Sequence, residues 1–206
     1  MGEHANGQLL EWGVATRSRP GEMTVGDLSL ITYVPDGALI TVIDGLGHGR
    51  EAARAAQIAA TVARSYKGSD LLSLVRACHQ ALRETRGAAM SVAFISASEA
   101  TMAWSGIGNV EGRLLSASPS SAGTKGSLRL QSGVAGHELP TMVTATLAIR
   151  RGDVLVFATD GIGAAFGDSL SIAGSPQYIA HRILRHHRKL TDDALVLVVR
   201  YLGGHP

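Results

Sequence analysis

The order of the predicted secondary-structure elements constrains the fold of this chain more than any other feature. Two helices are predicted in succession, an Ala-rich segment over 50–65 and an amphipathic segment that begins after the N-cap residue Asp70. A third helix over 177–188 precedes the last strand, 194–201. The remaining predicted strands cover 9–16, 28–34, 38–43, 90–96, 101–105, 110–115, 142–149 and 154–158. Grouped helices favour an α+β fold with antiparallel sheets over a doubly wound parallel sheet.

The composition indicates a single folded domain over residues 1–206, because 45% of the residues are hydrophobic and only 17% are charged. The net charge of +2 gives no electrostatic reason to expect a nucleic-acid or membrane partner. No apolar run approaches the ~18 residues that cross a bilayer. Residues 1–7 lack the basic and apolar regions of a signal peptide, so we expect a cytoplasmic protein. The single cysteine, Cys78, lies on an apolar helical stripe and is expected to be a buried thiol.

Four aspartates stand at the ends of predicted apolar strands. They are Asp27 before 28–34, Asp44 after 39–43, Asp160 after 154–158, and Asp193, beside Asp192, before 194–201. Any one of them fits a turn, since Asp-Gly is a common turn dipeptide. Four together favour a shared metal site, because clustered carboxylates repel one another unless cations neutralise them. Oxygen donors without a cysteine cluster favour Mg²⁺ or Mn²⁺, and two such ions suit the hydrolysis of phosphate esters.

The segments around these aspartates resemble the ordered motifs of a known enzyme family. The segments are Val25-Gly26-Asp27, Asp44-Gly45-Leu46-Gly47-His48-Gly49, Ala158-Thr159-Asp160-Gly161-Ile162 and Thr191-Asp192-Asp193-Ala194. They are similar to motifs of the metal-dependent Ser/Thr protein phosphatases (the PPM family), and more narrowly of its SpoIIE-type branch. Within that branch the chain is most similar to the stand-alone RsbX-like phosphatases, which act on stressosome proteins.

This resemblance implies a fold, a metal site and a substrate class. The fold would be an αββα sandwich of two antiparallel sheets flanked by helices. Two Mn²⁺ or Mg²⁺ ions would be held by Asp44, which bridges them, by the carbonyl of Gly45, and by Asp160 and Asp193. Asp27 would act from an outer position, and Asp44, Asp160 and Asp193 would be the catalytic residues. The bare backbone of Gly45 lets its carbonyl approach an ion closely.

The substrate implied by the resemblance is phosphoserine or phosphothreonine in a signalling protein. A stressosome component that controls a general stress response is the first expectation. A phosphatase that acts on an anti-sigma-factor antagonist is an alternative. A non-catalytic module of the same fold that binds a phosphoprotein is a further alternative, although the intact acidic set disfavours it.

Two polar residues near the motifs have open roles. The eukaryotic members of the family place a His directly after Asp-Gly, whereas here Leu46 and Gly47 precede His48. His48 is therefore either a general acid or a residue that caps or packs at the start of the next helix. Asn109 either orients a loop near the site or is an ordinary turn residue.

Other motifs are weaker. The glycines at 45, 47 and 49 lack the spacing of a dinucleotide fingerprint, because Arg50 stands at the last position. His137-Glu138 lacks the second His of a zincin motif. The basic segment 181–189 is either a solvated helix face or a contact for an acidic partner or the phosphoprotein. Residues 116–127 are predicted to form a flexible surface loop.

Overall fold

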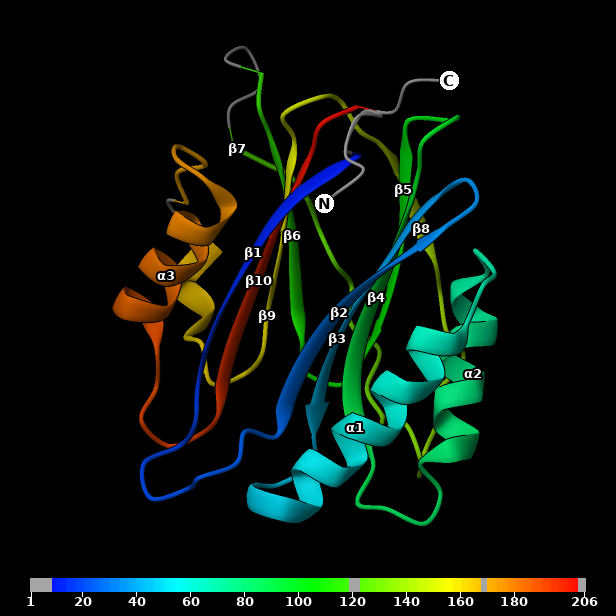
Figure 1. The fold of residues 1–206 in the computed structure, drawn as a ribbon, viewed down its shortest axis with the longest axis vertical. Coiled ribbons are helices and arrows are strands. Elements are labelled where there is room, and N and C mark those ends of the chain that lie inside the picture. Colours follow the sequence, from blue (N-terminus) through cyan, green and yellow to red (C-terminus); the bar gives the residue numbers. More distant parts are fainter. Residues whose placement is uncertain (1–8, 119–122, 168–169, 204–206) are drawn as a thin grey trace, which may run out of the picture.

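A computed structural model describes residues 9–118, 123–167 and 170–203 of the chain. Two antiparallel five-stranded sheets lie face to face in it (Figure 1). The first sheet contains, in spatial order, β1 (Leu10–Arg17), β10 (Ala194–Tyr201), β9 (Val154–Ala158), β6 (Glu111–Ser116) and β7 (Gly123–Ser127). The second contains β2 (Asp27–Val34), β3 (Gly37–Gly45), β4 (Ala88–Ser96), β5 (Thr101–Ile107) and β8 (Ala145–Ala148).

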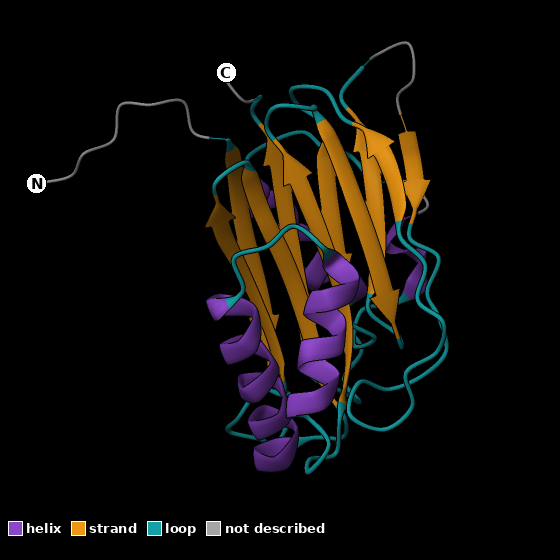
Figure 2. Cartoon of the chain, turned by 90° about the vertical axis from the view of Figure 1, so that its right-hand side faces the viewer, coloured by secondary structure: helices purple, strands orange, loops and turns teal. Residues whose placement is uncertain are grey.

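Helices cover the outer faces of both sheets, which confirms the expected αββα sandwich. The helices α1 (Gly49–Ser65) and α2 (Leu71–Ala81) pack on the second sheet (Figure 2). The helix α3 (Pro176–His187) packs on the first sheet, close to the short 3₁₀ helix η2 (Ala164–Gly167). No helix in the described ranges is long and apolar enough to cross a membrane.

The central strands are apolar on both sides because each side is covered. In β3, Ile40 faces the core between the two sheets, while its neighbour Leu39 faces the helices. In β10, Leu197 and Val198 divide in the same way between the inter-sheet core and the core beneath α3. Successive strand residues point to opposite faces, so a strand buried on both sides reads as a continuous apolar run.

Several predicted details are confirmed. The strands predicted over 28–34 and 38–43 are present as β2 and β3, and they pair as a hairpin with Val34 opposite Gly37. Asp70 caps α2, since its carboxylate accepts a hydrogen bond from the backbone N–H of Leu72 at 3.0 Å. Cys78 is fully buried on the inner face of α2.

Other details differ from the predictions. Part of the expected loop over 116–127 is the edge strand β7, which pairs with β6; residues 119–122 of that loop lie outside the described ranges. The segment has no apolar alternation, so only its pairing with β6 reveals a strand. The strand predicted over 142–149 is shorter, since β8 begins at Ala145.

The topology brings four strand ends to the same end of the sandwich. Antiparallel pairing places the start of β2 directly opposite the end of β3. The end of β9 and the start of β10 are neighbours in the other sheet, where Ala158 pairs with Val196. The segment that joins β1 to β2 runs along this end, at the bottom of Figure 1.

Candidate active site

The first pair of site residues comes from the β2–β3 hairpin. Asp27 and Asp44 are Cα partners in the register of these strands. Asp27 is only 3% exposed, and its Oδ2 accepts a hydrogen bond at 2.7 Å from the hydroxyl of Thr159, which follows β9. This bond crosses from one sheet to the other. It fixes the Asp27 carboxylate between the start of β2 and the end of β9.

Asp160 enters from the opposite sheet, directly after Thr159. The Nδ2 of Asn109 donates a hydrogen bond to its Oδ2 at 2.7 Å, so Asn109 does orient a site residue. The Nζ of Lys189 donates to the backbone carbonyl of Asp160, also at 2.7 Å. Asp160 is thereby held on its side-chain and main-chain oxygens by two segments far apart in the sequence.

These residues surround a small cavity of about 200 Å³. Its lining residues are Arg19, Asp44, Leu46, Gly47, His48, Asn109, Asp160 and Asp192. Three carboxylates therefore face one hollow, although they come from three separate parts of the chain. Arg19 is the only Lys or Arg among the described residues that line it.

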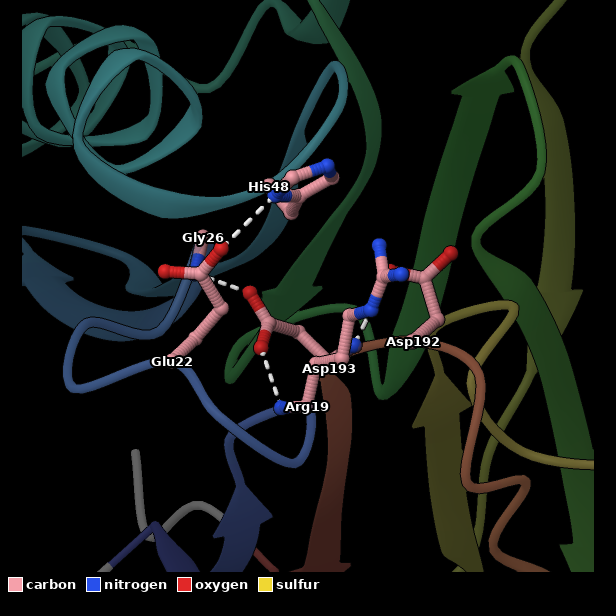
Figure 3. A network of polar contacts seen from close by, with 6 residues as sticks. All are labelled: Arg19, Glu22, Gly26, His48, Asp192 and Asp193. Atoms are coloured by element: carbon pink, nitrogen blue, oxygen red, sulfur yellow. Dashed lines mark hydrogen bonds and ion pairs between the residues drawn. The ribbon is translucent and has the colours of Figure 1, made fainter.

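The two adjacent aspartates before β10 have different surroundings (Figure 3). Asp193 is 3% exposed, and both of its carboxylate oxygens accept backbone hydrogen bonds, from the N–H of Arg19 at 2.7 Å and from that of Gly26 at 2.6 Å. Asp192 lines the cavity, and its Oδ1 accepts a bond from the N–H of Asp193 at 2.9 Å. The structure therefore brings Asp192, and not Asp193, into the cavity with Asp44 and Asp160.

The aspartates strongly perturb one another. Burial, followed by repulsion from Asp27, Asp160 and Asp192, raises the pKa of Asp44 to about 9. Burial, with repulsion from the neighbouring aspartates, raises the pKa of Asp27 to about 7, although the Thr159 hydrogen bond opposes this shift. Burial and the charge of Asp192 also raise the pKa of Asp160. Three aspartates of one site, Asp27, Asp44 and Asp160, thus have pKa values above the ordinary range, because they are buried and lie close to other carboxylates.

His48 stands at the mouth of the same cavity and pairs with a carboxylate. Its Nδ1 lies 2.8 Å from Oε1 of Glu22, in the segment between β1 and β2 (Figure 3). His48 occupies the N-cap position of α1, but its side chain makes no capping hydrogen bond. The side chain of His48 therefore does not cap α1. It lies beside the cavity, as the role of general acid requires.

Gly45 ends β3 next to Asp44 but does not line the cavity. A Cβ at this position would lie 2.0 Å from the backbone carbonyl oxygen of Ala52 in α1. The absence of a side chain thus allows α1 to start tightly against the strand end that carries Asp44. The N–H of Gly45 donates to the carbonyl of Gly26 at 3.1 Å, which ties the two strands together beside the carboxylates.

The donor types fit divalent metal ions such as Mg²⁺ or Mn²⁺, which prefer carboxylate and carbonyl oxygens. Among the described residues, no group of three or more His, Cys, Asp or Glu side chains is arranged to hold a metal ion as it stands. Carboxylates that repel one another separate unless a cation lies between them. The three carboxylates on the cavity, with the pKa values of Asp44 and Asp160 raised, are what an acidic metal site has before a cation neutralises it.

Comparison with known proteins identifies the family. No curated protein sequence matches the chain. The model of the family described as Stage II sporulation protein E (SpoIIE) matches residues 35–202. The chain belongs to the SpoIIE family. This finding agrees with the resemblance carried by the aspartate motifs, all of which except the one at Asp27 lie within the matched residues.

Several solved structures have a fold similar to that of this SpoIIE-family chain. One structure comes from work on the bacterial stressosome, described as a modular system that has been adapted to control secondary messenger signalling. It is 29% identical in sequence, with a TM-score of 0.83, and the match covers 94% of this chain and 100% of that chain. RsbX in complex with magnesium is 21% identical, with a TM-score of 0.83 and coverage of 96% and 98%. The catalytic domain of the serine/threonine phosphatase PstP with two manganese ions is 17% identical, with a TM-score of 0.64 and coverage of 94% and 98%.

Sequence reasoning did not find every residue at the site. Asp192, Arg19 and Glu22 become site residues only in the folded chain. The alternation of side chains offers a signal for Asp192, since adjacent residues at the start of a strand point to opposite sides. Arg19 and Glu22 lie in an irregular segment, where no periodicity indicates which side chains face the cavity.

Proposed function

We propose that this chain is a metal-dependent phosphatase that removes phosphate from phosphoserine or phosphothreonine in a signalling protein. The observation that carries the proposal is the 200 Å³ cavity on which Asp44, Asp160 and Asp192 converge opposite Arg19. A carboxylate cluster of this kind binds divalent cations, and an arginine at its rim recognises phosphate oxygens. Cations and an arginine around one small hollow suit a phosphoryl group.

Asp44, Asp160 and Asp192, which line the cavity, would hold two Mn²⁺ or Mg²⁺ ions. The carbonyl of Gly45, next to Asp44 but outside the lining of the cavity, is the further donor that the resemblance implies. Asp192 takes the role that the resemblance implies for Asp193, because both oxygens of Asp193 already accept backbone hydrogen bonds. When bound, such ions lower the pKa of the attacking water and neutralise charge on the phosphoryl oxygens. Asp27 acts from beneath the cavity, where its bond to Thr159 fixes its position.

The other lining residues position the substrate and move a proton. Arg19 donates hydrogen bonds to the phosphate oxygens and orients the phosphoryl group. Asn109 holds the Asp160 carboxylate in place. His48, oriented by Glu22, protonates the leaving serine or threonine oxygen. A carboxylate that holds one ring nitrogen of a histidine leaves the other nitrogen to face the substrate.

The proposed substrate is a stressosome-type phosphoprotein, and the pathway is a general stress response. This choice is supported by the 29% identical structure from the bacterial stressosome, which this chain matches over 94% of its length, and by the likeness in fold to RsbX. The alternative substrate is the phosphorylated form of an anti-sigma-factor antagonist. Incubation of the protein with both kinds of phosphoprotein, followed by mass spectrometry, distinguishes them by which phosphate is lost first.

The test of the activity itself compares two Asp→Asn variants. The wild-type protein should hydrolyse p-nitrophenyl phosphate and a phosphoserine peptide with Mn²⁺ or Mg²⁺ and lose this activity in EDTA. Asp44→Asn should abolish hydrolysis and remain folded, because burial and repulsion from the neighbouring aspartates already favour a neutral carboxyl at this position, and the amide is neutral too. Asp36→Asn, at the opposite end of β3, is the matched control and should retain activity.

Two results would contradict the proposal. Activity that survives EDTA, or that survives Asp44→Asn, would show that the acidic cavity is not the catalytic site. Tight binding of a phosphoprotein without any turnover in Mn²⁺ or Mg²⁺ would favour the alternative of a non-catalytic binding module.

A further inference from the structure

A groove separate from the acidic cavity lies beside α3. It is a groove of about 700 Å³ between the C-terminal half of α3 and the end of β1. Its lining includes three arginines and a histidine, with two leucines as apolar members: Arg17, His181, Arg185, Arg188, Leu184 and Leu190. No Asp or Glu is present among the described residues that line it. The groove is therefore a concave basic surface and not merely a charged helix face.

The arginines of this groove, which we call the α3 groove, lack acidic partners. Arg17, Arg185 and Arg188 form no salt bridge with any residue in the described ranges. Two arginines elsewhere are paired, Arg113 with Glu111 at 3.2 Å and Arg200 with Glu11 at 2.9 Å. The positive charge of the α3 groove is thus left for a ligand from outside.

One of these arginines is held in place by the fold. Nη2 of Arg188 donates a hydrogen bond to the carbonyl of Ser18 at 2.9 Å. The backbone of Arg188 also forms a bridge with Ile162, two residues after Asp160. A guanidinium that is already positioned loses less conformational freedom when it binds a carboxylate.

Two short segments connect the α3 groove to the catalytic cavity. Arg17 lines the groove and Arg19 lines the cavity, while Leu190 lines the groove and Asp192 lines the cavity. Two residues of extended chain span only about 7 Å, so the two hollows are neighbours. Both segments run to the lower end of the molecule in Figure 1, beside α3.

We propose that the α3 groove binds an acidic segment of the phosphoprotein substrate, a few residues away from the phosphorylated residue in the cavity. The proposal rests on the proposed phosphatase function and adds a preference for sequence around the phosphosite. Glutamate or aspartate side chains of the substrate would pair with Arg17, Arg185 and Arg188. Leu190, whose side chain is 68% exposed, would contact an apolar residue of the same segment.

The experiment uses fluorescein-labelled phosphoserine peptides that differ only in their flanks. One peptide carries three glutamates, three to five residues from the phosphoserine, and the other carries glutamines at the same positions. Both are made with the charged run on the N-terminal side and on the C-terminal side. Wild-type kcat/KM should be higher for one of the glutamate peptides, and the preference should disappear in 0.5 M NaCl, where charges are screened within a few ångströms.

Two charge-reversal variants locate the effect. Arg185→Glu should lower kcat/KM for the preferred glutamate peptide by roughly 3- to 10-fold, with little change for the glutamine peptide or p-nitrophenyl phosphate. Arg185 is exposed and lies in the last turn of α3, away from the proposed catalytic residues. Arg64→Glu changes the same charge in the last turn of α1, on the opposite side of the molecule, and should leave the preference intact.

Binding of the unphosphorylated peptides, measured by fluorescence polarisation, separates this proposal from the proposed function. If the wild-type protein hydrolyses no phosphate ester but binds the glutamate peptide through Arg185, the phosphatase proposal fails and the groove stands. If it hydrolyses both peptides equally, or if Arg64→Glu has the effect of Arg185→Glu, the groove proposal fails and the phosphatase proposal stands. Displacement of the labelled peptide by a single-stranded oligonucleotide, at a lower concentration than unlabelled peptide requires, would also overturn the groove proposal. The groove would then bind nucleic acid in preference to an acidic peptide.

Discussion

Changing Asp193 to Asn should mainly lower the stability of the protein, whereas changing its neighbour Asp192 to Asn should mainly weaken metal binding. Asp193 accepts two short backbone hydrogen bonds in a buried position, from Arg19 and Gly26. Asn has only one side-chain oxygen, so one of these N–H groups would lose its acceptor and face an NH₂ group. A hydrogen bond to a charged group contributes about 1.5–3 kcal/mol, and a buried donor left without a partner costs about 1–3 kcal/mol.

Relief of the repulsion that Asp193 exerts on Asp27 offsets part of this loss. We therefore expect Asp193→Asn to lower the free energy of unfolding of the metal-free protein by about 2–4 kcal/mol. For a domain of this size that lowers Tm by roughly 5–15 °C. Asp192→Asn should leave Tm unchanged or slightly raised, since the Asn oxygen can still accept the bond from the N–H of Asp193 and one repelling charge is gone.

Metal binding should be weakened more by Asp192→Asn than by Asp193→Asn, the reverse of their effects on stability. Thermal unfolding in EDTA, followed by circular dichroism, measures stability, and calorimetric titration with Mn²⁺ at a temperature where both variants are folded measures affinity. Asp192→Asn should weaken Mn²⁺ binding strongly and abolish hydrolysis. The reasoning would be refuted if Asp193→Asn matched the wild-type Tm while losing Mn²⁺ binding, because Asp193 would then be the ligand and its backbone bonds unimportant for stability.

Three further predictions concern titratable groups. The metal-free protein should become less stable as pH rises from about 4 to about 9. Burial and repulsion raise the pKa of Asp27 from the ordinary 3.8 to about 7, and that of Asp44 to about 9. The folded chain therefore binds more protons than the unfolded chain over this pH range, and its stability falls as these protons are lost. Urea unfolding in EDTA at a series of pH values measures this, and a rise in stability over the same range would contradict it. His48→Gln should slow the hydrolysis of a phosphoserine peptide by about 100-fold or more. It should hardly affect the hydrolysis of p-nitrophenyl phosphate, because the nitrophenolate leaving group is stable without a proton. Equal losses of activity on both substrates would exclude His48 as the proton donor. Cys78 should not react with a thiol reagent until the protein unfolds, because it is buried and burial raises its pKa to about 12, and rapid labelling of the folded protein would show that α2 opens readily.

Much of the fold follows from local patterns in the sequence. The apolar stripe and cap of α2, the alanines of α1 and the apolar runs of β2 and β3 each predict the element that forms. The assignment of strands to sheets does not follow from such patterns. The chain passes from β5 in one sheet to β6 in the other within a few residues, and β6 then pairs with β9, which is distant in the sequence. Long-range pairing of this kind is decided by packing against both sheets and not by the strands' own residues.

The site could be predicted to the level of strand ends but not of individual side chains. Each aspartate motif correctly indicates where a strand ends at the acidic end of the sandwich. Which of Asp192 and Asp193 reaches the cavity depends on the path of the segment around Arg19 and Gly26, whose N–H groups bind Asp193. That segment has no periodic pattern, and its contacts exist only after the two sheets have packed.

The two Asp-Gly pairs share a structural cause that explains why the same signature occurs at both sheets. A Cβ on Gly45 would lie 2.0 Å from the carbonyl oxygen of Ala52, and a Cβ on Gly161 would lie 1.9 Å from that of Asp193. In each case the chain that follows or faces the strand end packs directly against the glycine, with no room for a side chain. This close approach brings the preceding aspartate into a crowded interior, where burial raises the pKa of Asp44 and Asp160 alike. The glycines are therefore part of the acidic site, because they let two sheets and a helix converge tightly enough for their carboxylates to share one cavity.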